Sequence, residues 1–314
     1  MLIGKRKPLV ENLLLVEGIS RAGKFLLANL LAGFKGIEPM QYYGLLELIP
    51  VFTKLRFIDK RMAEELIQCE IDTHCYEMLI GRNFNLRLSD KSSIFNHPRH
   101  KEYLKRCSQE DGDAALKKFY KEKPYSFFIM HELMPNIDIY FDLYPKLKII
   151  NIQRSPVDLV FSWYKRGLVR RFKNDPKNFI IPLEEKKSVF PWYVYPHQKK
   201  ISALSEMDKT IFIIDRLFNI YENKFKILSE NRRKKIIFVR YEDIIFKPRK
   251  VVRHIAGFLQ KKPLPQMSGI LKREKLPNKL YSDSKNKKIA EIRKIASGLY
   301  FNKLLKIEKK YFSS

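Results

Sequence analysis

Short apolar runs bounded by polar or turn residues are the first regular feature of the chain. Four such runs lie at 13–16, 126–130, 147–152 and 236–239. Because nearly every position in them is apolar, they predict short strands that are buried on both faces. Other stretches carry apolar residues at steps of three and four, which predicts helices with one buried face. These stretches are 25–31, 137–143, 211–228 and 251–259. Strands that alternate with helices predict an α/β fold with a parallel sheet covered on both faces.

Two long regions fit this alternation poorly. Residues 69–123 are polar with a turn-rich centre, and residues 166–209 are basic and aromatic. We expect one domain over residues 1–314, in which both regions are insertions. The second is expected to form a lid over the ligand, whereas the first fits a surface loop equally well.

The balance of charge is unusual for a globular chain of 314 residues. There are 62 Lys and Arg residues against 34 Asp and Glu residues, which gives a formal net charge of +28 spread along the whole chain. Such a charge favours anionic partners such as phosphorylated cofactors, glycans, nucleic acids or acidic membranes. An AT-rich genome, which favours lysine codons, would account for part of the same excess.

The three cysteines, Cys69, Cys75 and Cys107, form neither an even framework nor a CxxC pair, so a disulfide scaffold is not expected. His74 lies beside Cys75, but this spacing resembles a metal site only loosely, and we expect no metal. The N-terminus lacks the apolar region of a signal peptide, and no stretch approaches the ~20 apolar residues of a membrane span. A cytoplasmic protein without a transmembrane segment is expected.

The segment 18–25 joins the first predicted strand to the first predicted helix. Gly18 and Gly23 allow backbone angles closed to other residues, so that amides can approach an anion. The N–H groups at the start of the helix attract negative charge, and two basic side chains add to this attraction. The expected ligand-binding residues of this loop are Ser20, Arg21, Ala22, Gly23, Lys24 and Phe25. The spacing GxxxxGK is that of a nucleoside-triphosphate loop, but Phe25 stands where such loops carry the Ser or Thr that ligates Mg²⁺.

A second candidate phosphate-binding motif begins where the third predicted strand ends. Arg154 follows that strand, Ser155 is a suitable helix cap, and Pro156 suits the first helical position. Ser162 lies eight residues after Arg154. A guanidinium and a hydroxyl near the start of one helix can share a phosphate. Two such motifs in one chain favour a nucleotide with phosphates at both ends.

The segment 154–164 closely resembles the 3′-phosphate-binding motif of sulfotransferases, which use 3′-phosphoadenosine-5′-phosphosulfate (PAPS). The family form is an Arg, a Pro two residues later, an Asp, and a Ser eight residues after the Arg. The matching residues are Arg154, Pro156, Asp158 and Ser162.

Two further segments resemble the same family. The loop 18–26 is similar to the family's 5′-phosphosulfate loop, with Arg21 at the position of its basic catalytic residue. Family loops usually read Ser-Gly-Thr-Thr where this chain has Ala-Gly-Lys-Phe at 22–25. The segment 236–253 is similar to the family's late strand, Tyr-Glu-Asp turn and Pro-led helix. The resemblance implies a P-loop-like three-layer sandwich that forms one sulfotransferase domain, with PAPS as the sulfuryl donor.

The resemblance also implies roles for single residues. Arg21 and Lys24 are expected to stabilise the leaving 5′-phosphate. A base for the acceptor hydroxyl is also needed, and Glu38 lies roughly where carbohydrate and tyrosyl members carry a Glu. His131 or Glu132, directly after the second strand, lies near the place of the His used by cytosolic members. All three residues remain candidates, with Glu38 preferred.

The acceptor is expected to be a hydroxyl, and a carbohydrate is favoured over other classes. A Glu base, four aromatic residues and five basic residues in or near 166–209 all suit a glycan. The aromatic residues are Trp163, Trp192, Tyr193 and Tyr195, and the basic residues are Lys165, Arg166, Arg170, Arg171 and Lys173. Two alternatives remain: a nucleotide-dependent kinase that uses the GxxxxGK loop, and an inactive polyanion-binding protein. No motif of a specific nucleic-acid partner is found.

Overall fold

A computed structural model describes residues 3–4, 6–108, 112–171, 175–176, 180–185, 187–278 and 284–313. Contacts between residues divide the chain into two compact units. Unit 1 comprises the described residues of 1–18, 23–152 and 229–277. Unit 2 comprises those of 19–22, 153–228 and 278–314. The chain therefore passes from unit 1 into unit 2 and back within the loop 18–25.

Unit 1 is built on a four-stranded sheet with the order β2-β1-β3-β6. The strands are β1 (Leu13–Glu17), β2 (Ser126–Ile129), β3 (Lys148–Gln153) and β6 (Ile236–Arg240). β1 pairs in parallel with β2 and with β3, so that Val16 lies opposite Ile129 and Ile150. β1 and β2 are buried at every position, which is why their sequences are continuous apolar runs.

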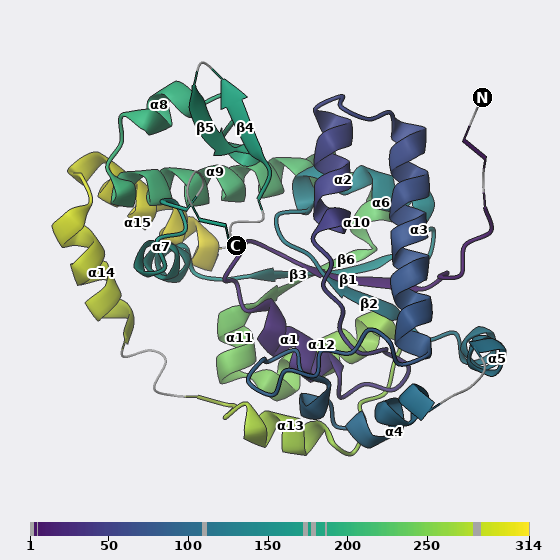
Figure 1. Ribbon diagram of the computed structural model, residues 1–314. Coiled ribbons are helices and arrows are strands. Elements are labelled where there is room, and N and C mark those ends of the chain that lie inside the picture. The colour runs from purple at the N-terminus through teal and green to yellow at the C-terminus, as the bar shows by residue number, and fades with distance from the viewer. Residues whose placement is uncertain are drawn as a thin grey trace. The chain divides into compact units, whose positions relative to one another are not determined.

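Helices cover both faces of this sheet, with α1, α11 and α12 on one face and α2, α3 and α6 on the other (Figure 1). The α-helices of unit 1 are α1 (Lys24–Leu31), α2 (Leu45–Lys54), α3 (Lys60–Leu79), α4 (His100–Leu104), α5 (Gly112–Glu122), α6 (Asp138–Leu143), α10 (Glu230–Arg233), α11 (Tyr241–Phe246), α12 (Pro248–Leu259) and α13 (Met267–Arg273). Its short 3-10 helices are η1 (Ile94–Asn96), η2 (Lys105–Ser108) and η3 (Met134–Asn136).

An irregular segment extends the sheet beyond β2. Ile37 forms a parallel bridge with Tyr125, and Gln41 forms one with Phe128. The chain at 37–41 thus follows β2 from its start to its carboxyl end. Helix α2 begins four residues after Gln41, and so it begins near the carboxyl end of β2.

Unit 2 is formed around α7 (Pro156–Lys165), which packs against three other helices. These are α9 (Glu206–Ile227), α14 (Ser284–Ile295) and α15 (Gly298–Ser313). The remaining elements are β4 (Pro182–Glu185), β5 (Ser188–Pro191), η4 (Trp192–Val194) and α8 (Gln198–Ser202). β4 and β5 form an antiparallel pair, which the sequence did not predict.

The predicted fold class is confirmed: the structure is α/β, with a central parallel sheet between layers of helices. The predicted strands are found as β1, β2, β3 and β6, and the predicted helices as α1, α6, α9 and α12. α9 begins five residues before the predicted stretch, because the Ser205 side chain accepts the Asp208 N–H at 3.2 Å and caps the helix there. The expectation of one domain with a lid at 166–209 stays a prediction.

Among the described residues, no helix is both long and apolar enough to cross a membrane.

Candidate functional site

The loop between β1 and α1 depends on its two glycines. Gly18 has φ 155° and Gly23 has φ 107°, a region that side chains rarely enter. An added Cβ would collide with the Ile152 carbonyl oxygen at Gly18 and with the Tyr241 ring at Gly23. The close approach of these neighbours explains why glycine stands at both positions.

The start of α1 presents backbone N–H groups at the end of this loop. Gly23 is the N-cap of α1, and no side chain among the described residues caps this helix. The Ala22 N–H donates to the Ile19 carbonyl at 3.0 Å, so it closes the turn. The Lys24 ammonium is buried and donates to the Gly18 carbonyl at 2.7 Å. In the part of the predicted loop that belongs to unit 1, the first backbone N–H groups of α1 are the best suited to bind an anion.

In unit 2, side chains in α7 and just before it hold the backbone in the middle of the loop. The Trp163 indole donates to the Ser20 carbonyl at 2.8 Å, and Arg154 Nη1 donates to the Arg21 carbonyl at 3.1 Å. Arg21 Nε in turn donates to the Ser162 hydroxyl at 3.4 Å. Arg21 has φ 74°, a left-handed conformation that is strained for a non-glycine residue. The structure therefore brings Arg21, Arg154 and Ser162 together, three residues that the sequence put in two separate motifs.

The start of α7 has the predicted cap. The Ser155 hydroxyl accepts the Asp158 N–H at 3.4 Å, and Pro156 is the first helical residue. Asp158 is 3% exposed and forms an ion pair with Lys288 of α14 at 2.6 Å. A longer contact of 3.9 Å joins Asp158 to Arg154 Nε.

A glutamate that the sequence did not single out lies beside His131 in unit 1. Glu47, in the first turn of α2, accepts the His131 backbone N–H at 2.5 Å. Its Oε1 also lies 2.8 Å from His131 Nδ1. Burial raises the pKa of Glu47 to about 8, against the opposing effects of the His131 N–H and the Lys24 charge. Glu47 and His131 thus form a hydrogen-bonded pair that can exchange a proton near neutral pH.

Two neighbours complete the surroundings of this pair. The ring of Tyr42 is about half exposed and lies edge-on to the His131 ring, with 5.2 Å between their centroids. Burial and the charges of Glu47 and Glu132 raise the pKa of Tyr42, so its hydroxyl stays protonated. Glu132 is buried and has a left-handed backbone, with φ 47°.

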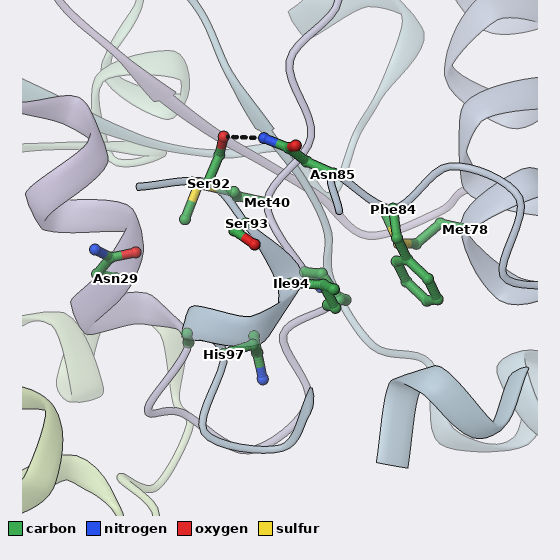
Figure 2. Close-up of a pocket in the computed structure, with 11 residues that line it drawn as sticks. Asn29, Met40, Met78, Phe84, Asn85, Ser92, Ser93, Ile94 and His97 are labelled. Carbon is green, nitrogen blue, oxygen red and sulfur yellow. Dashed lines mark hydrogen bonds between the residues drawn. The ribbon is translucent and has the colours of Figure 1, made fainter. Parts of the chain in front are cut away.

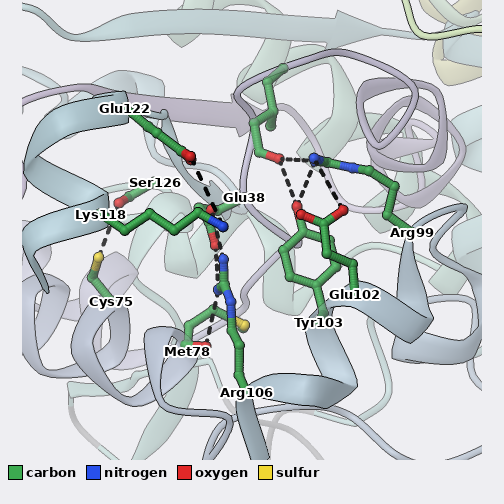
Figure 3. A network of polar contacts seen from close by, with 11 residues as sticks. Glu38, Cys75, Met78, Arg99, Glu102, Tyr103, Arg106, Lys118, Glu122 and Ser126 are labelled. Atoms are coloured by element: carbon green, nitrogen blue, oxygen red, sulfur yellow. Dashed lines mark hydrogen bonds and ion pairs between the residues drawn. The ribbon is translucent and has the colours of Figure 1, made fainter. Parts of the chain in front are cut away.

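Glu38, the preferred candidate for the base, lies beside the start of β2. Its backbone N–H donates to Tyr125 at the start of β2, whereas ligands of such sheets bind at the carboxyl ends of strands. Its carboxylate is buried and accepts hydrogen bonds from Arg106 at 2.6 and 3.2 Å (Figure 3). Burial lowers the pKa of Arg106, but the opposing effects of Glu38, Tyr103 and Cys75 together are larger, so the net pKa is raised. A buried guanidinium thus fixes the Glu38 carboxylate beside the start of β2.

A small pocket in unit 1 lies away from these residues. It is lined in part by Asn29 and Ala32 at the end of α1, and by Ser93 and His97 (Figure 2). Burial and the charges of Arg99 and other neighbouring cations lower the pKa of His97 to about 3, so the imidazole is neutral. The pocket lies at the opposite end of α1 from Lys24, and its lining residues are uncharged, so it does not suit a phosphate.

Most of the residues expected to bind a glycan have other contacts. Trp163 and Tyr193 are buried, so their rings cannot stack on a sugar, which corrects that expectation. Lys165 is paired with Glu291, Arg170 with Glu206 and Arg171 with Asp175. Arg166 is exposed, Trp192 is partly exposed, and Tyr195 is 51% exposed. Lys173 lies outside the described residues.

Comparison with known proteins supplies an independent observation. The model of the sulfotransferase domain matches residues 142–304, which include β3, α7 and most of the C-terminal helices. No curated protein matches the chain.

Three solved structures are similar to the chain at low identity. The sulfotransferase domain from the curacin biosynthetic pathway is 12% identical, with a TM-score of 0.44, and the match covers 84% of this chain and 77% of that one. The sulfotransferase domain of the Synechococcus PCC 7002 olefin synthase is 13% identical, with a TM-score of 0.44 and coverage of 96% and 94%. Sulfotransferase STF1 from Mycobacterium tuberculosis H37Rv is 11% identical, with a TM-score of 0.40 and coverage of 84% and 71%.

Proposed function

The chain belongs to the sulfotransferase family, and from this premise we propose that it transfers a sulfuryl group from PAPS to a hydroxyl acceptor. The family assignment depends on the domain match over residues 142–304, which covers half of the chain. The observation that carries the choice of donor is the contact of Arg154 and Ser162 with Arg21. These three side chains bring two positive charges and a hydroxyl together, which suits a doubly phosphorylated nucleotide.

The donor groups of the chain fit PAPS in their chemistry. In unit 2, Arg154 and Ser162 would hold the 3′-phosphate, and Arg21 would stabilise charge on the 5′-phosphate. In unit 1, the N–H groups at the start of α1 suit a phosphate as well. When bound, PAPS supplies the sulfuryl group. The Phe25 side chain has no oxygen that could bind a metal ion. A donor without a γ-phosphate does not need such an ion.

We propose the Glu47–His131 pair, instead of Glu38, as the base that accepts the proton of the acceptor hydroxyl. A base is most effective when its pKa lies near the working pH, and the pKa of Glu47 is about 8. His131 holds the carboxyl group through its backbone N–H and its ring. His131, predicted as an alternative base, therefore takes part as the partner of a residue that the sequence did not indicate.

A carbohydrate remains the acceptor class that we propose, now supported by Tyr42. Its ring is half exposed and touches His131, and an exposed aromatic ring beside the base offers a surface for the apolar face of a sugar. The same ring would also accept a phenol. Turnover of an oligosaccharide panel against a panel of simple phenols separates the two classes, and an exclusive preference for phenols would remove the carbohydrate.

Calorimetric titration tests the choice of cofactor directly. Adenosine 3′,5′-bisphosphate, the product left after sulfuryl transfer, should bind more tightly than ATP with Mg²⁺. Arg154→Ala should abolish this preference. Arg293→Ala, which removes an exposed arginine of α14, is the matched control and should leave it intact.

The other outcomes distinguish the alternatives. A preference for ATP with Mg²⁺ would favour a kinase and overturn the proposal. Salt-dependent binding of heparin or DNA, with no binding of either nucleotide, would indicate an inactive polyanion-binding protein.

A further inference from the structure

Two buried carboxylates join the start of α7 to the C-terminal helices of unit 2. Asp158 is 3% exposed and pairs with Lys288 of α14, and Glu308 of α15 is 7% exposed. The Glu308 carboxylate accepts the Ser155 hydroxyl at 2.7 Å and the Val157 N–H at 3.0 Å. Lys285 adds an ion pair to Glu308 at 2.7 Å. Ser155, Val157 and Asp158 all lie within one helical turn of Arg154.

The distances around Asp158 show which cation neutralises it. Lys288 Nζ lies 2.6 Å from Oδ1, whereas Arg154 Nε lies 3.9 Å from Oδ2. Coulomb attraction falls with distance and is strong where water is excluded. Because Lys288 supplies the short contact, the Arg154 guanidinium is not drawn into a close pair with Asp158. It donates instead to the Arg21 carbonyl.

Loss of Lys288 would change this balance. A buried carboxylate without a close cation carries a large desolvation cost. Among the described residues, Arg154 is the other cation seen beside Asp158, at 3.9 Å, and its guanidinium would move toward Asp158, which would offset part of its charge. Both the position of Arg154 and the charge that it offers to a phosphate would then be altered.

We propose that Lys288 is a positioning residue for the 3′-phosphate. It neutralises Asp158 and so keeps Arg154 in place to bind the phosphate, while Glu308 holds the first turn of α7 against α15. This inference rests on the proposed function, because it assigns Arg154 to the 3′-phosphate. It gives the C-terminal helices a role in the binding of the cofactor.

The test compares two nucleotides that differ only at the 3′ position. Adenosine 3′,5′-bisphosphate uses the 3′-phosphate site, whereas adenosine 5′-phosphate does not. Lys288→Met should weaken binding of the bisphosphate about tenfold and leave binding of adenosine 5′-phosphate unchanged. Lys288→Arg should preserve both affinities, because it keeps the charge.

A matched control and a rescue separate positioning from general damage. Lys303 of α15 pairs with the mostly buried Asp215 at 2.6 Å, away from the start of α7, and Lys303→Met should change neither affinity. The double variant Asp158→Asn/Lys288→Met removes the carboxylate charge that would attract Arg154. It should recover most of the lost affinity for the bisphosphate.

Three results would overturn the inference. Lys288→Met could leave both affinities unchanged, could weaken both nucleotides equally, or could fail to be rescued by Asp158→Asn. If the wild-type chain itself did not distinguish the two nucleotides, the proposed function would fall, and this inference with it. The wild-type measurement therefore tells the two failures apart.

Discussion

Unit 1 holds two glutamates at opposite ends of β2, and their surroundings differ in kind. Glu38 lies beside Tyr125, before the strand begins, and is held by Arg106. Glu47 lies beside His131, after the strand ends, and is held by a backbone N–H and an imidazole. With four residues at about 3.3 Å each, β2 separates the two ends by roughly 13 Å.

The comparison teaches that the partner, and not burial alone, decides what a carboxylate can do. Glu38 accepts two hydrogen bonds from the Arg106 guanidinium, which keeps its charge at all ordinary pH values, in an ion pair that supports the fold. The partner of Glu47 is itself titratable, and burial raises the pKa of Glu47 to about 8. The second arrangement can therefore take up and release a proton near neutral pH.

The largest expected effect is on turnover in Glu47→Gln. The amide keeps the acceptor oxygen for the His131 N–H but cannot take up a proton, so kcat should fall about a thousandfold. Turnover is measured as release of adenosine 3′,5′-bisphosphate from PAPS, with the best acceptor from a panel of saccharides, phenols and alcohols. The affinity for adenosine 3′,5′-bisphosphate should be unchanged.

Glu38→Gln is the matched control for that experiment, since it makes the same change at the other end of β2. Its kcat should stay within about threefold of wild type, because Glu38 lies outside the proposed catalytic pair. A collapse of kcat in Glu38→Gln with full activity in Glu47→Gln would reverse the assignment and restore Glu38 as the base.

The second effect is on stability, and here the larger change is expected at Glu38 and not at Glu47. Glu38→Gln leaves the buried Arg106 guanidinium without its carboxylate, and should lower the free energy of unfolding by about 3 kcal/mol. Urea denaturation followed by circular dichroism measures this loss. Glu38→Leu/Arg106→Met should lose less than Glu38→Gln, and an equal or greater loss would contradict the ion-pair explanation.

Much of the framework behind this comparison could be predicted from the sequence. β1, β2, β3 and β6 are short apolar runs buried in a sheet, and such runs are visible in any single sequence. The Ser155 cap and the Arg154 motif are local signals as well, because their parts lie within a few residues of one another.

The proposed base could not be predicted in the same way, because its position depends on long-range geometry. Glu38 and Glu47 are only nine residues apart, and either could follow the first helix into the site. Only the pairing of 37–41 with β2 shows that the chain at Glu38 still lies beside the start of that strand. In sequence, Glu47 looks like an ordinary acid in the first turn of a helix. The ion pairs of Lys288 and Arg106 join residues far apart in the chain and leave no local signal either.

The third effect is on how stability depends on pH. The pKa of Glu47 rises from an ordinary value of 4.5 to about 8 in the folded chain, so between these values the folded state holds a proton that the unfolded state has lost. Stability from this group is therefore complete below pH 4.5 and is lost as the pH rises through 8. Between pH 6 and 8 the loss should be about 2 kcal/mol.

Glu47→Gln, which cannot ionise, isolates this contribution. The difference in unfolding free energy between Glu47→Gln and wild type should move in favour of the variant as the pH rises from 6 to 8. Glu38→Gln should show no such trend relative to wild type. A difference between Glu47→Gln and wild type that is constant over this range would mean that Glu47 has an ordinary pKa.

The smallest effect is on the pH dependence of turnover, and it bears on the same proton. If Glu47 must be ionised to act as the base, a pKa of about 8 makes kcat rise with pH and level off above that value. The ionised fraction increases about tenfold between pH 7 and 9, and kcat measured at saturating PAPS and acceptor should follow it. The residual kcat of Glu47→Gln should lack this rise, whereas Glu38→Gln should keep it, because Glu47 is intact in that variant. An activity that falls with pH over the same interval would show that the pair must be protonated, and Glu47 would then be an acid in the reaction and not its base.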